Sequence, residues 1–286
     1  MKYHNLNIKN KYNKLNLSLN LFSLLFLFTN FITISNETLD YSKSNLRYIK
    51  NDAFGYGEKL EYKIGYKFIN AGTGSFIIGK DPIIRYGRKA YDINFEVKSL
   101  ASLEWIFKVR DRYSTILDVA SIIPWEFEQH IREGNFRRDF KAKFDQIENK
   151  AFADNKTYNI PENTHDIVSA FYYVRTLNLK SMKKDSVIML KNFFKDSTYN
   201  LGVKILGRET VKVEAGTFKT VVIQPLVQEG GLFKSDGKIV IWLTDDERKI
   251  PVKVGTKIAI GFVGAELTNY SGLRGPVEAL VKEGDN

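Results

Sequence analysis

The sequence contains no cysteine in its 286 residues. That absence excludes disulfide bonds, thiol catalysis, cysteine-ligated metal sites and a lipid-modified cysteine. The fold must therefore be held together by its hydrophobic core, and 43% of the residues are apolar, which is enough for a core of full size.

Histidine is almost as scarce. The chain has three, and only His130 and His165 lie beyond residue 36. Two histidines are too few for a three-histidine zinc site and leave few candidates for the base of a serine triad. The Gly-x-Ser-x-Gly elbow of many hydrolases is also absent. We expect no metal and no cofactor. His165 and Asp166 are candidates for an acid–base pair, but their position favours a helix cap with a surface imidazole.

Other catalytic and nucleotide-binding patterns are also missing. Gly72-x-Gly74 lacks the third glycine of a dinucleotide fingerprint, and no Lys-Ser/Thr pair of a phosphate loop follows it. Glu58 and Glu61 lie three apart, so on a strand they point to opposite faces, and the carboxylates at 245–247 fall where a turn is expected. A hydrolase would need two acids that converge in a pocket, so the sequence predicts a protein that is not an enzyme.

The charge balance is basic, and part of it lies at the N-terminus. The formal net charge is +10, and removing residues 1–36, with four lysines and no acids, leaves +6. The remainder favours peripheral contact with an anionic membrane face or a polyanion, or it reflects a lysine-rich solvated surface. Basic and aromatic residues alternate at Arg132, Phe136, Arg137, Arg138 and Phe140, a pattern that can bind nucleic acid. An ordinary strand with one face exposed to solvent has the same pattern, and we expect no nucleic-acid partner.

The first 36 residues have the three regions of a secretory signal in their usual order. An apolar run at 21–28 follows the four lysines and precedes a small polar patch at 33–36. A membrane anchor is the alternative, but the run is shorter than the roughly 20 residues that cross a bilayer. We expect residues 1–36 to be a signal peptide, and the protein to be exported to the periplasm or cell envelope of a Gram-negative bacterium. Without a cysteine for lipid attachment, a soluble periplasmic protein is favoured over a lipoprotein.

Beyond the signal, the pattern is that of β-strands. Residues 37–53 form a polar leader, a single β-rich domain spans 54–275, and 276–286 form a polar tail. Period-two alternation at 58–66 places Leu60 and Ile64 on one face of a strand. The small residues at 70–74 suit a turn or bulge. Further strands are expected at 76–78, 89–99, 110–117, 125–132, 137–144, 149–158, 186–192, 198–208, 209–214, 218–226, 237–243, 250–256 and 259–270.

One segment breaks this pattern. From His165 to Leu177 the apolar residues recur at three- and four-residue steps, which predicts an amphipathic helix. Thr164 is expected to cap its first turn, and Arg175 complements the dipole near its end. Hairpin turns are expected at 213–218 and 243–250. The fold class is mostly β: a curved antiparallel sheet or partly open β-barrel with one packed helix.

Aromatic residues are concentrated in the first half of the domain. They either fill a core or line an apolar cavity, because a curved sheet with one helix can leave an interior for a small apolar molecule. The candidate ligand-binding residues are Tyr62, Tyr66, Phe76, Phe95, Phe171 and Trp242.

Five segments in this order and spacing resemble the exported domain-of-unknown-function family 3108. They are Gly57–Tyr62, Ala71–Gly74, Asp166–Arg175, Ala215–Thr220 and Ile241–Pro251, and the resemblance spans roughly residues 54–271. The family is predicted to be periplasmic or envelope-associated and has no established activity. The resemblance implies a place and an architecture similar to the lipoprotein-carrier folds, a curved antiparallel sheet around a helix that shelters acyl chains.

These observations together predict a non-enzymatic envelope protein. It would bind a lipid or another apolar or amphipathic ligand in a curved β-sheet. The alternative is an envelope protein-interaction or glycan-binding module without a small-molecule cavity, whose partner is another envelope protein or an anionic glycan.

Overall fold

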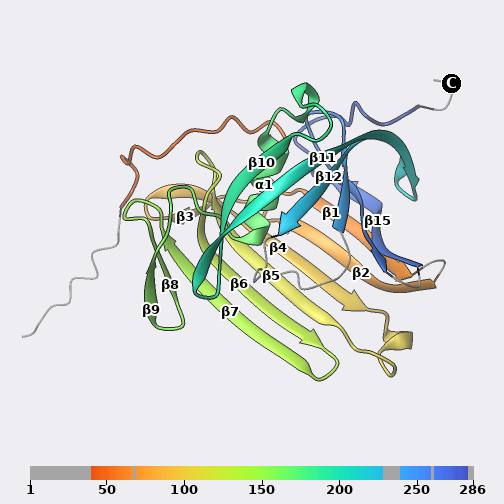
Figure 1. Ribbon diagram of the computed structural model, residues 1–286, viewed down its shortest axis with the longest axis horizontal. Coiled ribbons are helices and arrows are strands. Elements are labelled where there is room, and N and C mark those ends of the chain that lie inside the picture. Colours follow the sequence, from red (N-terminus) through yellow and green to blue (C-terminus); the bar gives the residue numbers. More distant parts are fainter. Residues whose placement is uncertain (1–39, 67–68, 228–238, 259–260, 283–286) are drawn as a thin grey trace, which may run out of the picture. The chain divides into compact units, whose positions relative to one another are not determined.

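The computed structural model describes residues 40–66, 69–227, 239–258 and 261–282. The expected signal peptide lies outside these residues. Strands and one α-helix make up the described chain, as the sequence predicts, and 15 strands form a single antiparallel sheet. The sheet curves around the helix without closing (Figure 1).

The first half of the chain builds nine strands before the helix α1 (Ile167–Thr176). They are β1 (Lys59–Tyr66), β2 (Ile69–Ile78), β3 (Ile83–Arg85), β4 (Arg88–Ser99), β5 (Arg110–Asp118), β6 (Pro124–Glu133), β7 (Phe136–Asp145), β8 (Lys150–Ala153) and β9 (Lys156–Asn159). Six follow it: β10 (Val187–Phe194), β11 (Ser197–Val213), β12 (Gly216–Val227), β13 (Ile239–Thr244), β14 (Pro251–Ile258) and β15 (Gly261–Ser271). Short 3₁₀ turns occupy Ala101–Leu103 and Leu179–Ser181.

The two halves are joined by one long-range pairing. Most strands that are neighbours in the chain pair as antiparallel hairpins, while β2 pairs with β4, and β1 pairs with β15. The order runs β10-β11-β12-β13-β14-β15-β1-β2-β4-β5-β6-β7-β8-β9, with β3 beside β4. The outermost strands of this path are β9 and β10, and the register does not connect them. The meander therefore becomes a continuous wall around α1.

Bulges and tight turns account for the departures from the predicted strands. The predicted strands at 198–208 and 209–214 are one strand, β11, because a bulge between Ile205 and Gly207 absorbs the irregularity. The predicted strand at 149–158 is the hairpin β8–β9, whose turn residues Asp154 and Asn155 have positive φ. The predicted irregularity at 70–74 is a bulge opposite Ile64 and Gly65.

Helix α1 begins differently from the prediction. Thr164 does not cap it, since its hydroxyl donates to the Pro161 carbonyl at 2.6 Å. Asp166 is the N-cap: its Oδ1 accepts from the amides of Val168 and Ser169 at 2.7 and 2.9 Å, and Ser169 Oγ accepts from the Asp166 amide. The same carboxylate accepts the Thr115 hydroxyl of β5 at 2.7 Å, which ties the start of the helix to the sheet.

The core lies on both sides of α1 and behind β1. One cluster packs Tyr172 and Val168 of the helix against β4–β8, and a second packs Ala170 and Val174 against β10–β13. A third cluster, which includes Phe218, joins β1, β12, β14 and β15. The predicted amphipathic helix thus packs against the concave face of the sheet (Figure 1).

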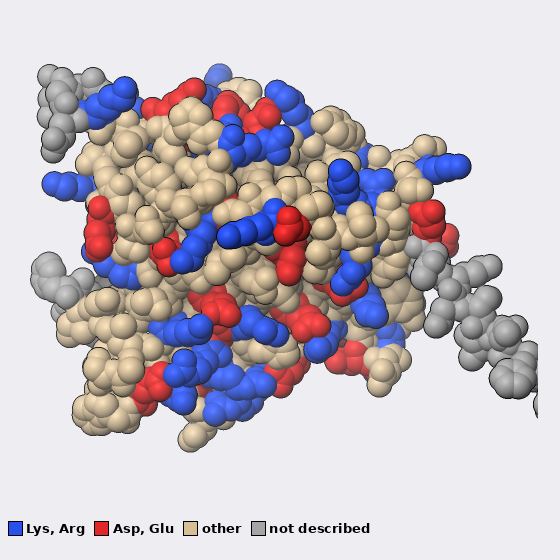
Figure 2. Space-filling model, turned by 180° about the vertical axis from the view of Figure 1, so that it is seen from behind, with Lys and Arg blue, Asp and Glu red and all other residues tan. Residues whose placement is uncertain are grey.

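The packed chain extends beyond the predicted 54–275 boundaries at both ends. Ala53 is buried in the first cluster, and Ile49 packs against that cluster. At the other end Ala279 is buried, and Val281 donates its amide to the Thr217 carbonyl at 2.8 Å. Charged side chains of both signs are interspersed over the face in Figure 2. Across the described ranges, no helix has both the length and the apolar composition that a membrane span requires.

Candidate functional site

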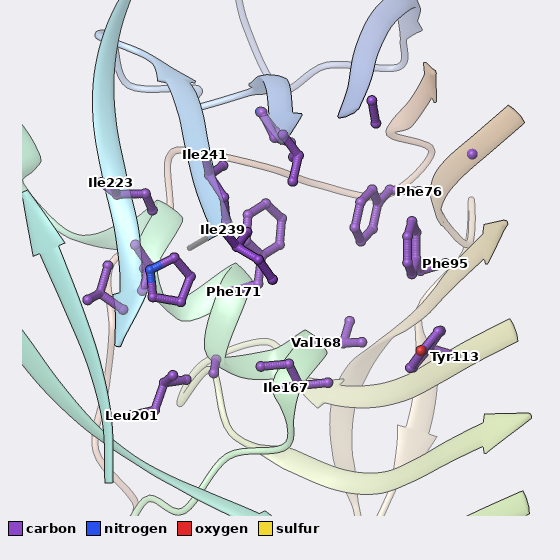
Figure 3. A pocket seen from close by; sticks show the side chains of 18 of the residues that line it. Phe76, Phe95, Tyr113, Ile167, Val168, Phe171, Leu201, Ile223, Ile239 and Ile241 are labelled. Atoms are coloured by element: carbon purple, nitrogen blue, oxygen red, sulfur yellow. The ribbon is translucent and has the colours of Figure 1, made fainter. Parts of the chain in front are cut away.

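An apolar cavity of about 280 Å³ lies between α1 and the concave face of the sheet. Phe76, Phe95 and Tyr113 of β2, β4 and β5 face it from one side, and strands β11–β13 face it from the other (Figure 3). Helix residues Ile167, Val168, Ala170, Phe171 and Val174 form its base, and further lining comes from Tyr62, Ile64, Gly74, Leu190, Leu201, Val203, Ile223, Pro225, Ile239, Ile241, Pro251, Val254 and Ala265.

The aromatic wall of this cavity follows directly from strand register. Phe76 pairs with Phe95 across β2 and β4, and Phe95 pairs with Tyr113 across β4 and β5. The Phe76 and Phe95 rings stack at a centroid distance of 4.2 Å with an interplanar angle of 17°. Phe171 of the helix continues the stack, 5.5 Å from Phe76. The sheet and the helix therefore present three nearly parallel rings to the cavity.

The cavity lining carries no ionisable side chain other than two tyrosines among the described residues. The Tyr62 hydroxyl donates to the Pro251 carbonyl at 2.8 Å, and burial raises the pKa of Tyr62 well above its usual value. Burial likewise raises the pKa of Tyr113. Both phenols are therefore neutral near pH 7, and the lining offers an apolar surface with neither a nucleophile nor a general base.

Four of the six predicted ligand-binding residues meet in this cavity: Tyr62, Phe76, Phe95 and Phe171. Trp242 does not line it, because strand alternation turns Ile241 inward and Trp242 to the other face. There the Trp242 indole donates to a carboxylate oxygen of Glu209. The side chain of Tyr66 lies outside the described residues.

Sequence reasoning missed the wall opposite the aromatic rings. Leu201, Ile223 and Ile241 come from three strands of the second half of the chain. Each lies in an ordinary alternating strand pattern, so the sequence contains no local signal that distinguishes a cavity wall from a core. Tyr113 belongs to the aromatic-rich first half and could have been included, since alternation places it on the inner face of β5.

Polar groups lie on the same concave face, next to the aromatic wall. Gln129 pairs with Tyr113 across β5 and β6 and is fully buried, and neither of its amide atoms has a partner with hydrogen-bonding geometry. One row further along, the buried Asp111 accepts the amide of Arg132 at 2.8 Å. Burial and the neighbouring Asp111 raise the pKa of Glu133, while Arg138 acts in the opposite direction. The inner face is therefore amphipathic along β5 and β6.

Asp111 and Glu133 are two converging acids that sequence reasoning did not pair. They lie on different strands, and only the β5–β6 hairpin brings them together. Neither lines the cavity. Glu58, by contrast, is bound to Arg175 by a buried ion pair. Asp246 accepts four hydrogen bonds within and beside its turn, so neither of these carboxylates is available for chemistry.

His165 is buried, so its predicted position as a surface imidazole is wrong. Arg47 Nη2 lies 3.2 Å from Nε2 and can only donate, which leaves the proton on Nδ1, 3.2 Å from Ser169 Oγ. Burial and then Arg47 lower the pKa of His165 to about 3, and burial raises the pKa of Asp166 to about 6. Both residues have structural roles at the start of the helix. Asp166 caps the helix, and His165 lies between Arg47 and Ser169.

No group of three His, Asp or Glu side chains in the described part of the chain is arranged to hold a metal ion. Among the described residues, the apolar cavity is the feature with the clearest capacity to hold another molecule.

The fold and cavity define a class of protein in which a curved, unclosed antiparallel sheet surrounds one helix and an apolar space. Residues 61–268 match the family described as "Protein of unknown function (DUF3108)", and the chain belongs to that family.

Two solved structures resemble the chain at low sequence identity. One is the beta-barrel-like protein of domain of unknown function DUF1849 from Brucella abortus, with 11% identity, a TM-score of 0.49, and coverage of 79% of this chain and 98% of that one. The other is the hypothetical protein CT021 from Chlamydia trachomatis, with 9% identity, a TM-score of 0.35, and coverage of 80% and 92%. No curated protein matches this chain.

Proposed function

We propose that this protein binds an apolar or amphipathic small molecule in the cavity between α1 and the sheet, and that it does so without catalysing a reaction. The observation that carries the proposal is the cavity itself, about 280 Å³ in volume with an almost wholly apolar lining. Protein interiors are close-packed, and voids larger than a water molecule are few. A concave apolar space of this volume lies near the lower end of the range for small-molecule sites.

The polar row beside the cavity supports an amphipathic ligand. An apolar chain would lie against Phe76 and Phe171, and a polar head would reach toward Gln129 or Asp111 along the inner face. Such a head could supply hydrogen bonds to the Gln129 amide, which lacks them. In this arrangement the carboxylates of Asp111 and Glu133 would face the polar head of the ligand rather than its apolar chain.

We also propose that the protein is exported to the periplasm or envelope. The lysine-rich, apolar and small-polar order of residues 1–36 supports this. Fractionation of the host, followed by sequencing of the N-terminus of the purified protein, tests it. An N-terminus near residue 37 in the periplasmic fraction is expected, and an uncleaved cytosolic protein would contradict export.

The binding proposal is tested by native mass spectrometry, with lipid extraction, on protein purified from its own host. A stoichiometric co-purifying lipid or other apolar molecule is expected. Loss of this molecule on delipidation should lower the midpoint of thermal unfolding, and adding it back should restore the midpoint, because a ligand that binds only the folded state stabilises it.

A cavity-filling substitution with a control on the same strand locates the binding site. Val254→Phe places a ring in the cavity, whereas Val252→Ala alters the core cluster behind β14. Val254→Phe should lose the bound molecule, and Val252→Ala should retain it at wild-type stoichiometry. A ligand-free wild-type mass would contradict the proposal and favour the alternative, a protein-interaction or glycan-binding module.

A further inference from the structure

Two hairpins at one end of the sheet expose large apolar side chains to solvent. Trp105 is 82% exposed, Ile106 63% and Phe107 54%, all in the connection between β4 and β5, and Phe136 at the β6–β7 hairpin is 47% exposed. We call these four residues the aromatic tip. Scattered exposed apolar residues are ordinary, but four in adjacent hairpins form a continuous feature that marks a binding surface.

The aromatic tip is an ordered structure. The amides of Ile106 and Phe107 donate to the Leu103 carbonyl at 3.0 and 3.2 Å, and the Trp105 indole donates to the Ser102 carbonyl at 3.0 Å. The fold therefore holds the exposed Trp105 ring in place rather than leaving it on a free loop.

The two hairpins are also fastened to each other. The Gly134 amide donates to the Lys108 carbonyl at 2.8 Å. A Cβ on Gly134, whose φ is +53°, would lie 2.8 Å from the Phe107 ring, so the glycine allows that ring to lie on the neighbouring hairpin. Ile69, at the β1–β2 hairpin, is 63% exposed at the same end, where the Leu100 amide donates to the Ala71 carbonyl at 2.9 Å.

The charge around the aromatic tip is predominantly positive. Segments 104–110 and 134–138 contain four cations, Lys108, Arg110, Arg137 and Arg138, and one acid, Glu104, which forms ion pairs with Lys108 and Arg110. Arg138 lies over the Phe136 ring at 5.2 Å from its centroid. In Figure 2 the end of the sheet that carries these hairpins is tan at its edge, and Lys and Arg side chains gather beside it.

We infer that the aromatic tip docks on the surface of an anionic lipid membrane. Tryptophan and phenylalanine partition into the boundary between headgroups and acyl chains, and flanking Lys and Arg are attracted to anionic headgroups. A stable protein–protein interface takes roughly 20–30 residues from each partner, whereas four exposed side chains with flanking cations are enough to enter the headgroup boundary, so the small aromatic tip matches a lipid surface better than a protein partner. The inference does not depend on what the cavity binds.

The position of the tip is also consistent with ligand exchange at a membrane. Tyr113 of the cavity lies three residues along β5 from Arg110, which is about 10 Å of strand. A docked tip with Arg110 at the headgroups would hold Tyr113 of the aromatic wall about that distance from them.

Flotation with vesicles tests the docking. The protein is purified from its own host, so that wild type and variants carry the same N-terminus, and is mixed with phosphatidylcholine vesicles with or without phosphatidylglycerol. Trp105→Ser combined with Ile106→Ser should weaken binding to the anionic vesicles about tenfold. The matched control is Val187→Ser combined with Met189→Ser, which removes exposed apolar side chains from the edge strand β10 and should bind as wild type does.

A second measurement reports on Trp105 itself. The chain has three tryptophans, and Trp125 is buried. Lipid brominated on its acyl chain should quench the wild-type emission, and the quenching should be lost in Trp105→Phe. The inference is overturned if brominated lipid leaves the wild-type emission unchanged, or if the Trp105→Ser/Ile106→Ser protein floats as well as wild type.

Discussion

Arg175 and Glu58 form a bidentate ion pair in the core, with Nη1 to Oε1 at 2.7 Å and Nη2 to Oε2 at 2.9 Å. Both side chains are almost completely buried. Nη2 also donates to the Arg248 carbonyl at 3.1 Å, and the guanidinium lies 5.3 Å from the centre of the Phe54 ring. The pair joins the end of α1 to the start of β1, so it fixes the helix on which the cavity rests.

Breaking this pair should be costly, because it leaves one charge buried without its partner. Glu58→Gln should lower the free energy of unfolding by about 3–5 kcal/mol, measured by urea denaturation. Glu58→Leu combined with Arg175→Met should cost less than the sum of the single changes, since neither charge then remains. A cost for Glu58→Gln below about 1 kcal/mol would show that the pair is solvated in solution.

The buried His165 predicts a pH dependence of stability. Its pKa falls from 6.5 to about 3 on folding, so the unfolded chain binds more protons between these values and stability drops as the pH falls through that window. From pH 7 to pH 5 the loss should be about 2 kcal/mol for this residue.

A non-titrating variant isolates that contribution. His165→Gln should lose less stability than wild type over the same pH range, by about 2 kcal/mol. Asp166, whose pKa is raised to about 6, acts in the opposite direction, but it is present in both proteins and largely cancels in the comparison. Parallel pH profiles for wild type and His165→Gln would disprove a depressed pKa.

Gln129 is predicted to destabilise the ligand-free fold. Its amide is fully buried, and neither polar atom has a partner with good hydrogen-bonding geometry, although the Tyr113 hydroxyl is close by. Each such atom costs about 1–3 kcal/mol. Gln129→Leu, which retains much of the volume, should therefore raise the urea midpoint of the delipidated protein. If the bound molecule satisfies this amide, the gain should shrink or reverse in protein that retains its ligand. A lower midpoint for the delipidated Gln129→Leu protein would contradict this prediction.

The turn at 243–250 depends on one carboxylate. Asp246 Oδ1 accepts from the amides of Arg248 and Lys249 and from the Thr244 hydroxyl, and Oδ2 accepts the Ala279 amide at 3.0 Å. Asp246→Asn can keep the three hydrogen bonds to Oδ1, but it places an amide donor against the donating Ala279 amide. The substitution should therefore lower the free energy of unfolding by about 1–3 kcal/mol.

The effect should be visible locally as well. Hydrogen exchange at residues 279–281 should accelerate in Asp246→Asn, because those residues are held by Asp246 and by β12. Unchanged exchange there would show that the pairing with β12 alone holds the C-terminal segment.

Local pattern was sufficient for most elements. Alternation placed Leu60 and Tyr62 on the inner face of β1, three- and four-residue steps located α1, and the turn residues at 213–218 and 243–250 located two hairpins. These features depend on neighbours within a few residues, which is why they can be read in order along the chain. The prediction that Thr164 caps the helix was wrong by two residues, because Asp166 is the cap. Thr and Asp can both cap a helix, and the ends of helices are hard to place to within one or two residues.

The sequence by itself therefore determined the fold class, the helix, the family and four of the cavity residues. Only the tertiary structure decided that β1 pairs with β15, that Leu201, Ile223 and Ile241 form the opposite wall, and that Trp242 faces away. It also decided that Glu58 meets Arg175, 117 residues further along the chain. Such pairings depend on the long-range register of the sheet, and period-two alternation specifies which residues share a face without specifying what that face will meet.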